Sequence, residues 1–221
     1  MPQPALIFDL DGTLVDTAPD LLGATNAVLK SQGRSPVDPG TLRHMVGFGA
    51  RSLIEQAMAA TGTPVAPSEL PTLLEIFLTH YRAHIADESV AFPGVEETLE
   101  RLVDEGERLA VLTNKAQEMA DLLLGALKLD RFFGVVYGAG RMSYVKPDAR
   151  IFHDVVRDLG GEPGIMIGDS ITDVATARAA KARVILVSYG YTPEPAHSLG
   201  GDAVTDSFAD IPGLVRTFQT S

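Results

Sequence analysis

The stretch Ala5-Leu-Ile-Phe-Asp-Leu-Asp-Gly-Thr-Leu14 decides the fold. It opens with an apolar run that lacks polar alternation, which is typical of a strand buried on both faces of a parallel sheet. Two carboxylates, Asp9 and Asp11, follow the run at once. Ligand sites of parallel sheets lie beyond the carboxyl ends of their strands, although Asp-Gly is also a common turn dipeptide. The stretch therefore predicts a buried strand that ends either at a ligand site or in a plain turn.

Apolar runs of the same kind recur along the chain and alternate with helical patterns. The runs predict strands at 5–8, 109–112, 134–137, 164–167 and 183–187. Apolar residues at helical spacing predict helices at 95–106, 116–127, 149–159 and 171–180. This alternation predicts an α/β protein whose core is a doubly wound, Rossmann-like parallel sheet.

A long segment near the N-terminus interrupts this alternation. About 100 residues separate Asp11 from Thr113, whereas a strand-helix-strand unit occupies only about 30. The segment carries helical patterns broken by glycine and proline, and no convincing strand, with the patterns at 21–29, 52–60 and 68–85. We therefore expect two domains, an α/β catalytic core of residues 1–15 and 90–221 and an inserted all-helical domain of residues 16–89.

The composition excludes several classes of function. The chain has 221 residues, a formal net charge of -11 and no cysteine. Without cysteine it has no disulfides, thiolate metal sites or cysteine nucleophile. The acidic excess provides no broad positive field for nucleic acid or for an anionic membrane surface, so we expect neither as a partner. The chain begins without a basic residue or a long apolar run, which favours a cytoplasmic protein.

Further polar residues stand at the ends of other expected strands or at helix starts. Thr113 and Asn114 follow the second expected strand, and Lys146 precedes a proline at a helix start. Asp169 and Asp173 follow the fourth expected strand, and their spacing places both carboxylates on one face of a helical turn. Taken singly, these residues also fit a helix cap or a solvated lysine, so their function depends on whether they meet.

The four aspartates are expected to meet above one edge of the sheet. Two carboxylates about 4 Å apart repel each other by roughly 4 kcal/mol at an effective dielectric constant near 20, so a cation is needed among them. Oxygen ligands favour a hard ion such as Mg²⁺, which in proteins commonly bridges carboxylates and a substrate phosphate. The strand-end threonine and the lysine would then neutralise the remaining charge of the phosphate. The set therefore predicts magnesium-dependent phosphate chemistry.

These motifs, in this order, identify the sequence as a member of the haloacid dehalogenase superfamily that resembles its phosphoglycolate phosphatase branch. The resemblance extends over nearly the whole chain and is carried by FDLDGTLVDTAPDL, VGFGARSLIEQA, FPGVEETLERL, LTNK, VKPDARIF, GDSITDVATARAA and YGYT. It implies that the helical insert is a mobile cap domain, which closes over the site, excludes bulk water and supplies specificity contacts.

The resemblance also implies roles for the four aspartates. Asp9 would be the nucleophile that forms an aspartyl-phosphate. Asp11 would protonate the leaving alkoxide and then take a proton from the attacking water. Mg²⁺ would be held by the Asp9 side chain, the Asp11 backbone carbonyl and Asp169, with Asp173 further out or acting through a water.

The contacts to the phosphate follow from the same resemblance. Thr113 and the amides around Gly12 and Asn114 would hold phosphoryl oxygens. Lys146 would balance charge on both the phosphate and Asp9.

Residues 47–51 of the insert stand where the resembled family has the cap loop that faces the catalytic site. The glycines of this segment also fit a plain helix cap. Gly49 and Arg51 are the candidate specificity residues, because a guanidinium can bind a substrate carboxylate through two hydrogen bonds. Arg43 and His44 are rivals for this role.

The resulting prediction is a magnesium-dependent phosphatase that hydrolyses a small phosphomonoester, with 2-phosphoglycolate as the leading candidate. Asp11 favours phosphoryl transfer over dehalogenation, because displacing a halide needs no proton donor, and Thr13 after Gly12 favours hydrolysis over mutase activity. Pyrophosphate, a sugar phosphate and phosphomutase activity remain open within this reading. A signalling phosphoacceptor domain and a non-catalytic binding module are more remote alternatives. The sequence is compatible with both a monomer and a homodimer.

Overall fold

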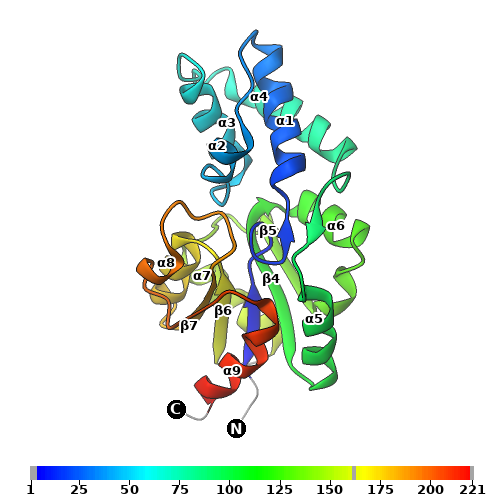
Figure 1. The fold of residues 1–221 in the computed structure, drawn as a ribbon, viewed down its shortest axis with the longest axis vertical. Helices are drawn as coiled ribbons and strands as arrows, with labels where there is room; N and C mark the ends of the chain where they lie inside the picture. Colours follow the sequence, from blue (N-terminus) through cyan, green and yellow to red (C-terminus); the bar gives the residue numbers. More distant parts are fainter. Residues whose placement is uncertain (1–3, 161–162, 220–221) are drawn as a thin grey trace.

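The core of the protein is a parallel sheet with helices on both faces (Figure 1). A computed structural model of the protein describes residues 4–160 and 163–219. Its main sheet has six strands, namely β1 (Ala5–Phe8), β4 (Arg108–Ala116), β5 (Val135–Ala139), β6 (Gly164–Gly168), β7 (Arg183–Val187) and β8 (Ala203–Thr205). They lie in the order β5-β4-β1-β6-β7-β8 and every neighbouring pair is parallel. The predicted α/β class and parallel sheet are confirmed.

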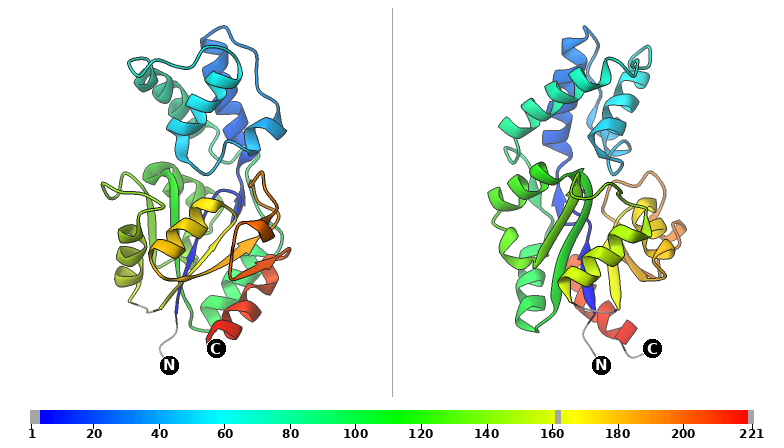
Figure 2. Two further views of the ribbon diagram at one scale, coloured as in Figure 1. Left: turned by 90° about the vertical axis from the view of Figure 1, so that its left-hand side faces the viewer. Right: turned by 180° about the vertical axis from the view of Figure 1, so that it is seen from behind.

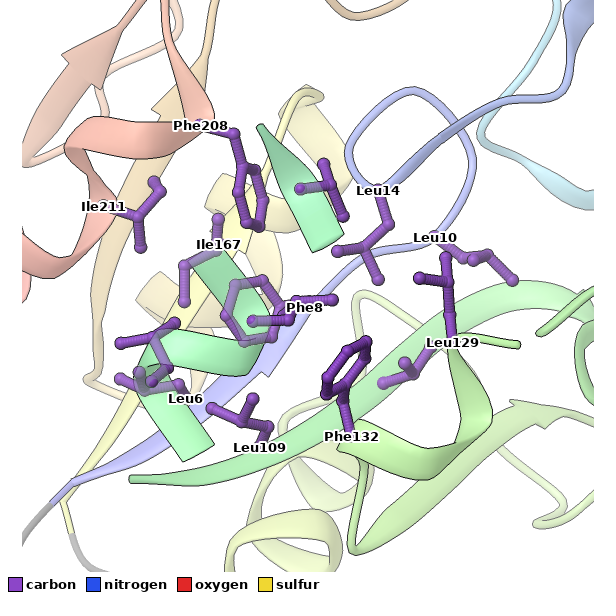
Figure 3. Close-up of a cluster of buried hydrophobic side chains, with 14 of the residues drawn as sticks. Leu6, Phe8, Leu10, Leu14, Leu109, Leu129, Phe132, Ile167, Phe208 and Ile211 are labelled. Atoms are coloured by element: carbon purple, nitrogen blue, oxygen red, sulfur yellow. The ribbon is translucent and has the colours of Figure 1, made fainter. Parts of the chain in front are cut away.

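Successive residues of β1 point to opposite faces of the sheet, and each face is covered by helices. Leu6 and Phe8 belong to one apolar cluster, which joins the sheet to α5 (Val95–Asp104), α6 (Gln117–Ala126) and α9 (Ile211–Gln219). Figure 3 shows Phe8 near the centre of this cluster, among Leu6, Ile167 and Phe208. The other face packs against α7 (Ala149–Leu159) and α8 (Ile171–Ala179). Burial on both faces explains why these strands lack polar residues.

The inserted segment is helical and lies beyond one edge of the sheet (Figures 1 and 2). It consists of α1 (Ala18–Ser31), α2 (Pro39–Arg43), α3 (Gly49–Ala60) and α4 (Leu70–Ala83). These helices enclose an apolar cluster of their own, which includes Leu29, Leu42, Ile54 and Phe77. Helix α2 was not predicted, because five residues are too few to show helical spacing. The sequence nevertheless contains a signal for its start, because Asp38 is the N-cap residue and its carboxylate accepts a hydrogen bond from the Thr41 amide.

A two-stranded ladder joins the insert to the core. β2 (Val15–Asp16) pairs antiparallel with β3 (Val90–Ala91) where the chain leaves the core and returns to it. The Asp20 carboxylate secures this junction by accepting hydrogen bonds from the Glu88 and Ser89 amides and from the Ser89 hydroxyl. The expectation of no strand within 16–89 is wrong at Asp16, because a two-residue ladder between distant segments leaves no sequence pattern. The strand β8 was also not predicted, because three residues are too few to show a strand pattern.

Parts of the predicted core segments lie outside the described residues, namely 1–3, 161–162 and 220–221. The very start of the chain, used above for the cytoplasmic expectation, is among them. Within 4–160 and 163–219, no helix is both long and apolar enough to cross a membrane.

Candidate active site

The chemistry-bearing residues gather at the carboxyl ends of three neighbouring strands. Asp9 follows β1, Asp169 follows β6, and Thr113 lies in the last part of β4. β1 lies between β4 and β6, so the three strand ends are adjacent. This is the place where strand order turns outward in both directions from the first strand, and such switch points are the usual ligand sites of open α/β sheets.

Three buried carboxylates form a compact cluster at this edge. Asp9, Asp169 and Asp173 each offer an oxygen, and these oxygens lie within 4.8 Å of one another. Burial, with added repulsion from Asp173 and Asp11, raises the pKa of Asp9 to about 7 despite the nearby Lys146. Burial and the charges of Asp173 and Asp9 raise the pKa of Asp169 to about 8. A buried excess of negative charge on oxygen donors fits a hard divalent cation.

Lys146 is the positive charge inside this cluster. Its ammonium lies 2.9 Å from Asp9 Oδ1 and 2.7 Å from Asp173 Oδ1. The other Asp173 oxygen accepts hydrogen bonds from the Asp169 amide, the Ser170 amide and the Ser170 hydroxyl. Asp173 therefore caps the start of α8 and fixes Lys146 against Asp9, which leaves little of its carboxylate free for a ligand.

Asp169 is held in one orientation from both sides. Its Oδ1 accepts a hydrogen bond of 3.0 Å from the Thr13 hydroxyl, and its Oδ2 accepts one of 2.8 Å from the Tyr191 amide. Two glycines make room for it. A Cβ at Gly12 would lie 2.5 Å from Asp169 Oδ2, and a Cβ at Gly190 would lie 2.2 Å from the Asp169 Cβ. Gly12 also has a φ of +84°, so this position needs glycine for both reasons.

Asp11 is paired with a lysine that the sequence analysis did not single out. The Lys115 ammonium donates to Asp11 Oδ1 at 2.7 Å, and the Thr17 hydroxyl donates to the same oxygen at 2.8 Å. Lys115 is buried and lies under the ring of Tyr81, 4.6 Å from its centroid. Burial lowers the pKa of Lys115, but Asp11 and Tyr81 more than compensate and raise it above its usual value. The sequence signal was its place directly after Thr113 and Asn114 at a strand end.

The predicted phosphate contacts lie close to this cluster. Thr113 is buried, and its hydroxyl accepts a hydrogen bond from the Lys115 amide at 3.1 Å. The Asn114 amide group donates to the carbonyls of Gly47 and Lys146, each at 3.3 Å, so it links the core to the insert. The Gly12 amide is occupied by the Val15 carbonyl at 3.0 Å. Of the three positions, Thr113 and Asn114 line the cavity described next, together with Lys115.

A cavity of about 40 Å³ lies between the insert and the strand ends. Its floor includes Asp9, Asp11 and Thr113, and its roof comes from α1, α3, α4 and the loop before α3. Gly49 is part of this roof, with a φ of +84° and a virtual Cβ only 3.1 Å from the Asn114 carbonyl. The inserted helices thus cover the cavity, and charged residues lie on its opposite side.

The structure does not bring Arg51 or Arg43 to this cavity. The Arg51 side chain is 69% exposed and forms an ion pair of 3.2 Å with Glu55 in the same helix. Arg43 pairs with Asp16 at 2.8 Å and lies over the ring of Tyr191. His44 lines a neighbouring hollow that also reaches Asp11.

Comparison with known proteins places the chain in a well-populated group. The family model described as haloacid dehalogenase-like hydrolase matches residues 6–187. A phosphoglycolate phosphatase of Caulobacter vibrioides is 45% identical over 98% of this chain and 92% of its own length. A phosphoglycolate phosphatase of Agrobacterium fabrum is 43% identical over 95% of this chain and 91% of its own length. The solved structure of a predicted phosphoglycolate phosphatase from Haemophilus somnus superimposes with a TM-score of 0.90 at 29% identity, covering 96% of this chain and 97% of that one.

Proposed function

The chain belongs to the haloacid dehalogenase-like hydrolases, and on that basis we propose that it is a magnesium-dependent phosphatase whose substrate is 2-phosphoglycolate. Two relatives at 45% and 43% identity over nearly the whole chain are phosphoglycolate phosphatases, which supports the substrate. One observation carries the chemistry: Asp9 lies 2.9 Å from the ammonium of buried Lys146, inside a cluster of carboxylates and beside Asp11. This is a nucleophile held among the charges that a phosphoryl group needs.

Asp9 acts as the nucleophile in this proposal. Its carboxylate attacks the phosphorus, the ester oxygen leaves, and water then hydrolyses the aspartyl-phosphate, so one difficult hydrolysis becomes two displacements. The Lys146 ammonium favours the charged form of Asp9 and partly offsets its burial, although the pKa of Asp9 is still raised to about 7. The hydrogen bond from the Leu10 amide to Asp9 Oδ1, at 2.7 Å, fixes the carboxylate further.

Asp11 acts as the general acid and then as the general base. It is two residues beyond the nucleophile, and both line the same cavity. Lys115 and Thr17 hold its Oδ1 at 2.7 Å and 2.8 Å, which leaves its Oδ2 to exchange a proton with the leaving alkoxide and with the attacking water. A positioned proton donor of this kind is what separates phosphoester cleavage from halide displacement.

The metal site of the proposal uses the carboxylate cluster. Asp9, the Asp11 backbone carbonyl and Asp169 would hold Mg²⁺, and Asp173 would support it from further out because its oxygens already bind Lys146 and the start of α8. Bound Mg²⁺ would neutralise charge on the phosphoryl oxygens. Thr113 and Asn114 would bind these oxygens as well, with Lys146 balancing their charge, whereas the Gly12 amide is already bound to the Val15 carbonyl.

The inserted helices serve as the cap, and we take residues 16–89 as this domain and residues 1–15 and 90–221 as the catalytic core. The Asn114 contact to the Gly47 carbonyl and the close approach of Gly49 to the Asn114 carbonyl support this division, because each joins residues of the two proposed domains. A closed cap over a small cavity favours a small leaving group and excludes bulk water from the aspartyl-phosphate.

The test is phosphate release from a panel of esters by the wild type and by Asp9→Asn, with and without Mg²⁺. The panel contains 2-phosphoglycolate, pyrophosphate and sugar phosphates, and Asp104→Asn on the exposed face of α5 is the matched control. We expect 2-phosphoglycolate to be cleaved best, only with Mg²⁺, and by the wild type and Asp104→Asn alone. Preference for another ester would refute the substrate, and full activity of Asp9→Asn would refute the nucleophile.

A further inference from the structure

The cavity under the cap contains a cation, Lys115, whose contact with Asp11 uses only one of its donors, and a buried hydroxyl, that of Tyr81, to which the proposed chemistry gives no role. Apart from Asp9, Asp11 and the polar residues in the last part of β4, its walls are largely apolar, with Leu21, Leu53, Phe77, Leu78 and Met119 among them. A single water centre takes about 10–15 Å³ of such space, so a cavity of about 40 Å³ admits only a few non-hydrogen atoms. A leaving group with two carbons suits this volume.

Lys115 provides the positive charge. Among the described residues that line the cavity, it is the one cation. An ammonium has three donors, and one of them binds Asp11 Oδ1 at 2.7 Å. The side chain is 5% exposed, so its remaining donors must find partners inside the cavity rather than in bulk water.

Tyr81 provides the second donor. The residue is 1% exposed, and its hydroxyl has no hydrogen-bond partner of normal geometry among the described residues, although the Lys115 ammonium is close enough to act on its pKa. A buried hydroxyl without a partner is unusual in a native structure and points to a ligand that completes it. Tyr81 comes from α4 of the cap, lies over the Lys115 ammonium and lines the same cavity. Cap and core thus each contribute one donor to one place.

We propose that Lys115 and Tyr81 together bind the carboxylate of the leaving group, so that they select an acidic ester over a neutral one. The proposal rests on the phosphatase function above. An anion is the ligand that a partly paired buried ammonium binds best, and a hydroxyl donor beside it suits the second carboxylate oxygen. Lys115 follows Thr113, the proposed phosphate contact, by two residues, so their Cα atoms are at most about 7 Å apart. This separation is short enough for the two side chains to bind a phosphate and a carboxylate that are joined through one methylene.

This assignment differs from the expectation for Arg51. That guanidinium is 69% exposed, pairs with Glu55 and lines a hollow next to the cavity, whereas Lys115 is inside the cavity with Asp9 and Asp11. If Lys115 binds the carboxylate, replacing Lys115 should reduce the preference for an acidic ester, whereas if Arg51 binds it, replacing Arg51 should do so.

The experiment compares two esters of equal length, 2-phosphoglycolate and 2-hydroxyethyl phosphate, through the ratio of their kcat/KM values. The ratio cancels effects on the chemistry common to both esters, including effects through the Lys115 contact with Asp11. We expect the wild type to favour the acidic ester, Lys115→Met to lose about 10- to 100-fold of that preference, and Tyr81→Phe to lose about 3- to 10-fold. Arg51→Gln and Lys30→Met, which removes an exposed cap cation, should keep the ratio within twofold.

Binding to the Asp9→Asn background gives an answer even where a variant hydrolyses neither ester. In calorimetry with Mg²⁺ present, adding Lys115→Met should weaken 2-phosphoglycolate and leave 2-hydroxyethyl phosphate nearly unchanged. Equal weakening of both esters, or loss of the preference in Arg51→Gln alone, would overturn the assignment of Lys115. A wild type that cleaves the neutral ester equally well would instead refute the proposed substrate, so the two failures are distinguishable.

Discussion

The two sides of the cavity differ in the kind of residue that lines them. On the core side the charges are buried and paired, with Lys146 between Asp9 and Asp173 and Lys115 on Asp11. On the cap side the surface facing the cavity is largely apolar, and a charged group such as Arg51 points to solvent with a partner from its own helix. The difference fits the proposed roles, in which the core is assembled in advance for phosphoryl transfer and the cap contributes shape, exclusion of water and one hydroxyl.

The largest effect should come from the centre of the core side. Asp9→Asn removes the proposed nucleophile and keeps its shape, so kcat/KM for 2-phosphoglycolate should fall by at least about 10⁴-fold. Rate measurements by phosphate release, with circular dichroism to show that the variant is folded, check this. Activity within about tenfold of the wild type would mean that the core side is not the catalytic side.

Metal and pH should act together on the core side. Burial raises the pKa values of Asp9 and Asp169 to about 7 and about 8, so between about pH 4 and pH 8 the folded state binds more protons than the unfolded state. This contribution to the free energy of unfolding therefore falls as pH rises through that window. Mg²⁺ offsets the repulsion between the carboxylates only where they are ionised. It should therefore raise the free energy of unfolding more at pH 8 than at pH 5.5.

Thermal unfolding with and without Mg²⁺ at the two pH values measures this effect. At an ion concentration of 100 times Kd, the stabilisation at pH 8 should approach about 2.7 kcal/mol. A shift in Tm that is equal at both pH values, or larger at pH 5.5, would contradict the role of the buried carboxylates.

A smaller effect should come from the packing around Asp169. A Cβ at Gly190 would lie 2.2 Å from the Asp169 Cβ, so Gly190→Ala should lower the free energy of unfolding by about 2 kcal/mol and weaken Mg²⁺ binding as the carboxylate shifts. Gly125→Ala in α6 is the control, because nothing lies within 4 Å of its virtual Cβ. Urea unfolding and Mg²⁺ titration of both variants test this. If Gly190→Ala changes neither the free energy of unfolding nor Mg²⁺ binding, the site tolerates a shift of the Asp169 carboxylate and the prediction is wrong.

The smallest effect should come from the solvent side of the cap. Arg51→Gln breaks an exposed ion pair within α3, so the free energy of unfolding should change by less than about 0.5 kcal/mol. The kcat/KM for 2-phosphoglycolate should stay close to that of the wild type. A large loss of activity in Arg51→Gln would break the comparison, because it would place a specificity charge on the cap.

The core of the protein could be predicted from its sequence because its signals are local. The apolar strands predicted the sheet, and Asp9, Thr113 and Asp169 follow from standing at strand ends. Each of these conclusions needs only a few consecutive residues and the geometry of a parallel sheet.

The remaining features depend on contacts between distant segments. The pairing of Lys115 with Asp11 and its cover by Tyr81 join the core to α4, and no spacing in the sequence indicates which lysine is buried. Gly190 and Tyr191 reach Asp169 from a loop beyond β7. Arg51 has a suitable side chain for binding a carboxylate, but it faces solvent. Which face of α3 is exposed depends on how all the helices of the cap pack, and the sequence around Arg51 does not show this.

The most direct test of the central claim is to trap the aspartyl-phosphate. Wild-type enzyme with Mg²⁺ is mixed with 2-phosphoglycolate labelled on its phosphate, quenched with acid within one turnover, and digested for peptide mapping. The proposal predicts label on the peptide that carries Asp9, and none in Asp9→Asn. Product formation in a single turnover without labelled protein, or with label on another residue, would contradict it.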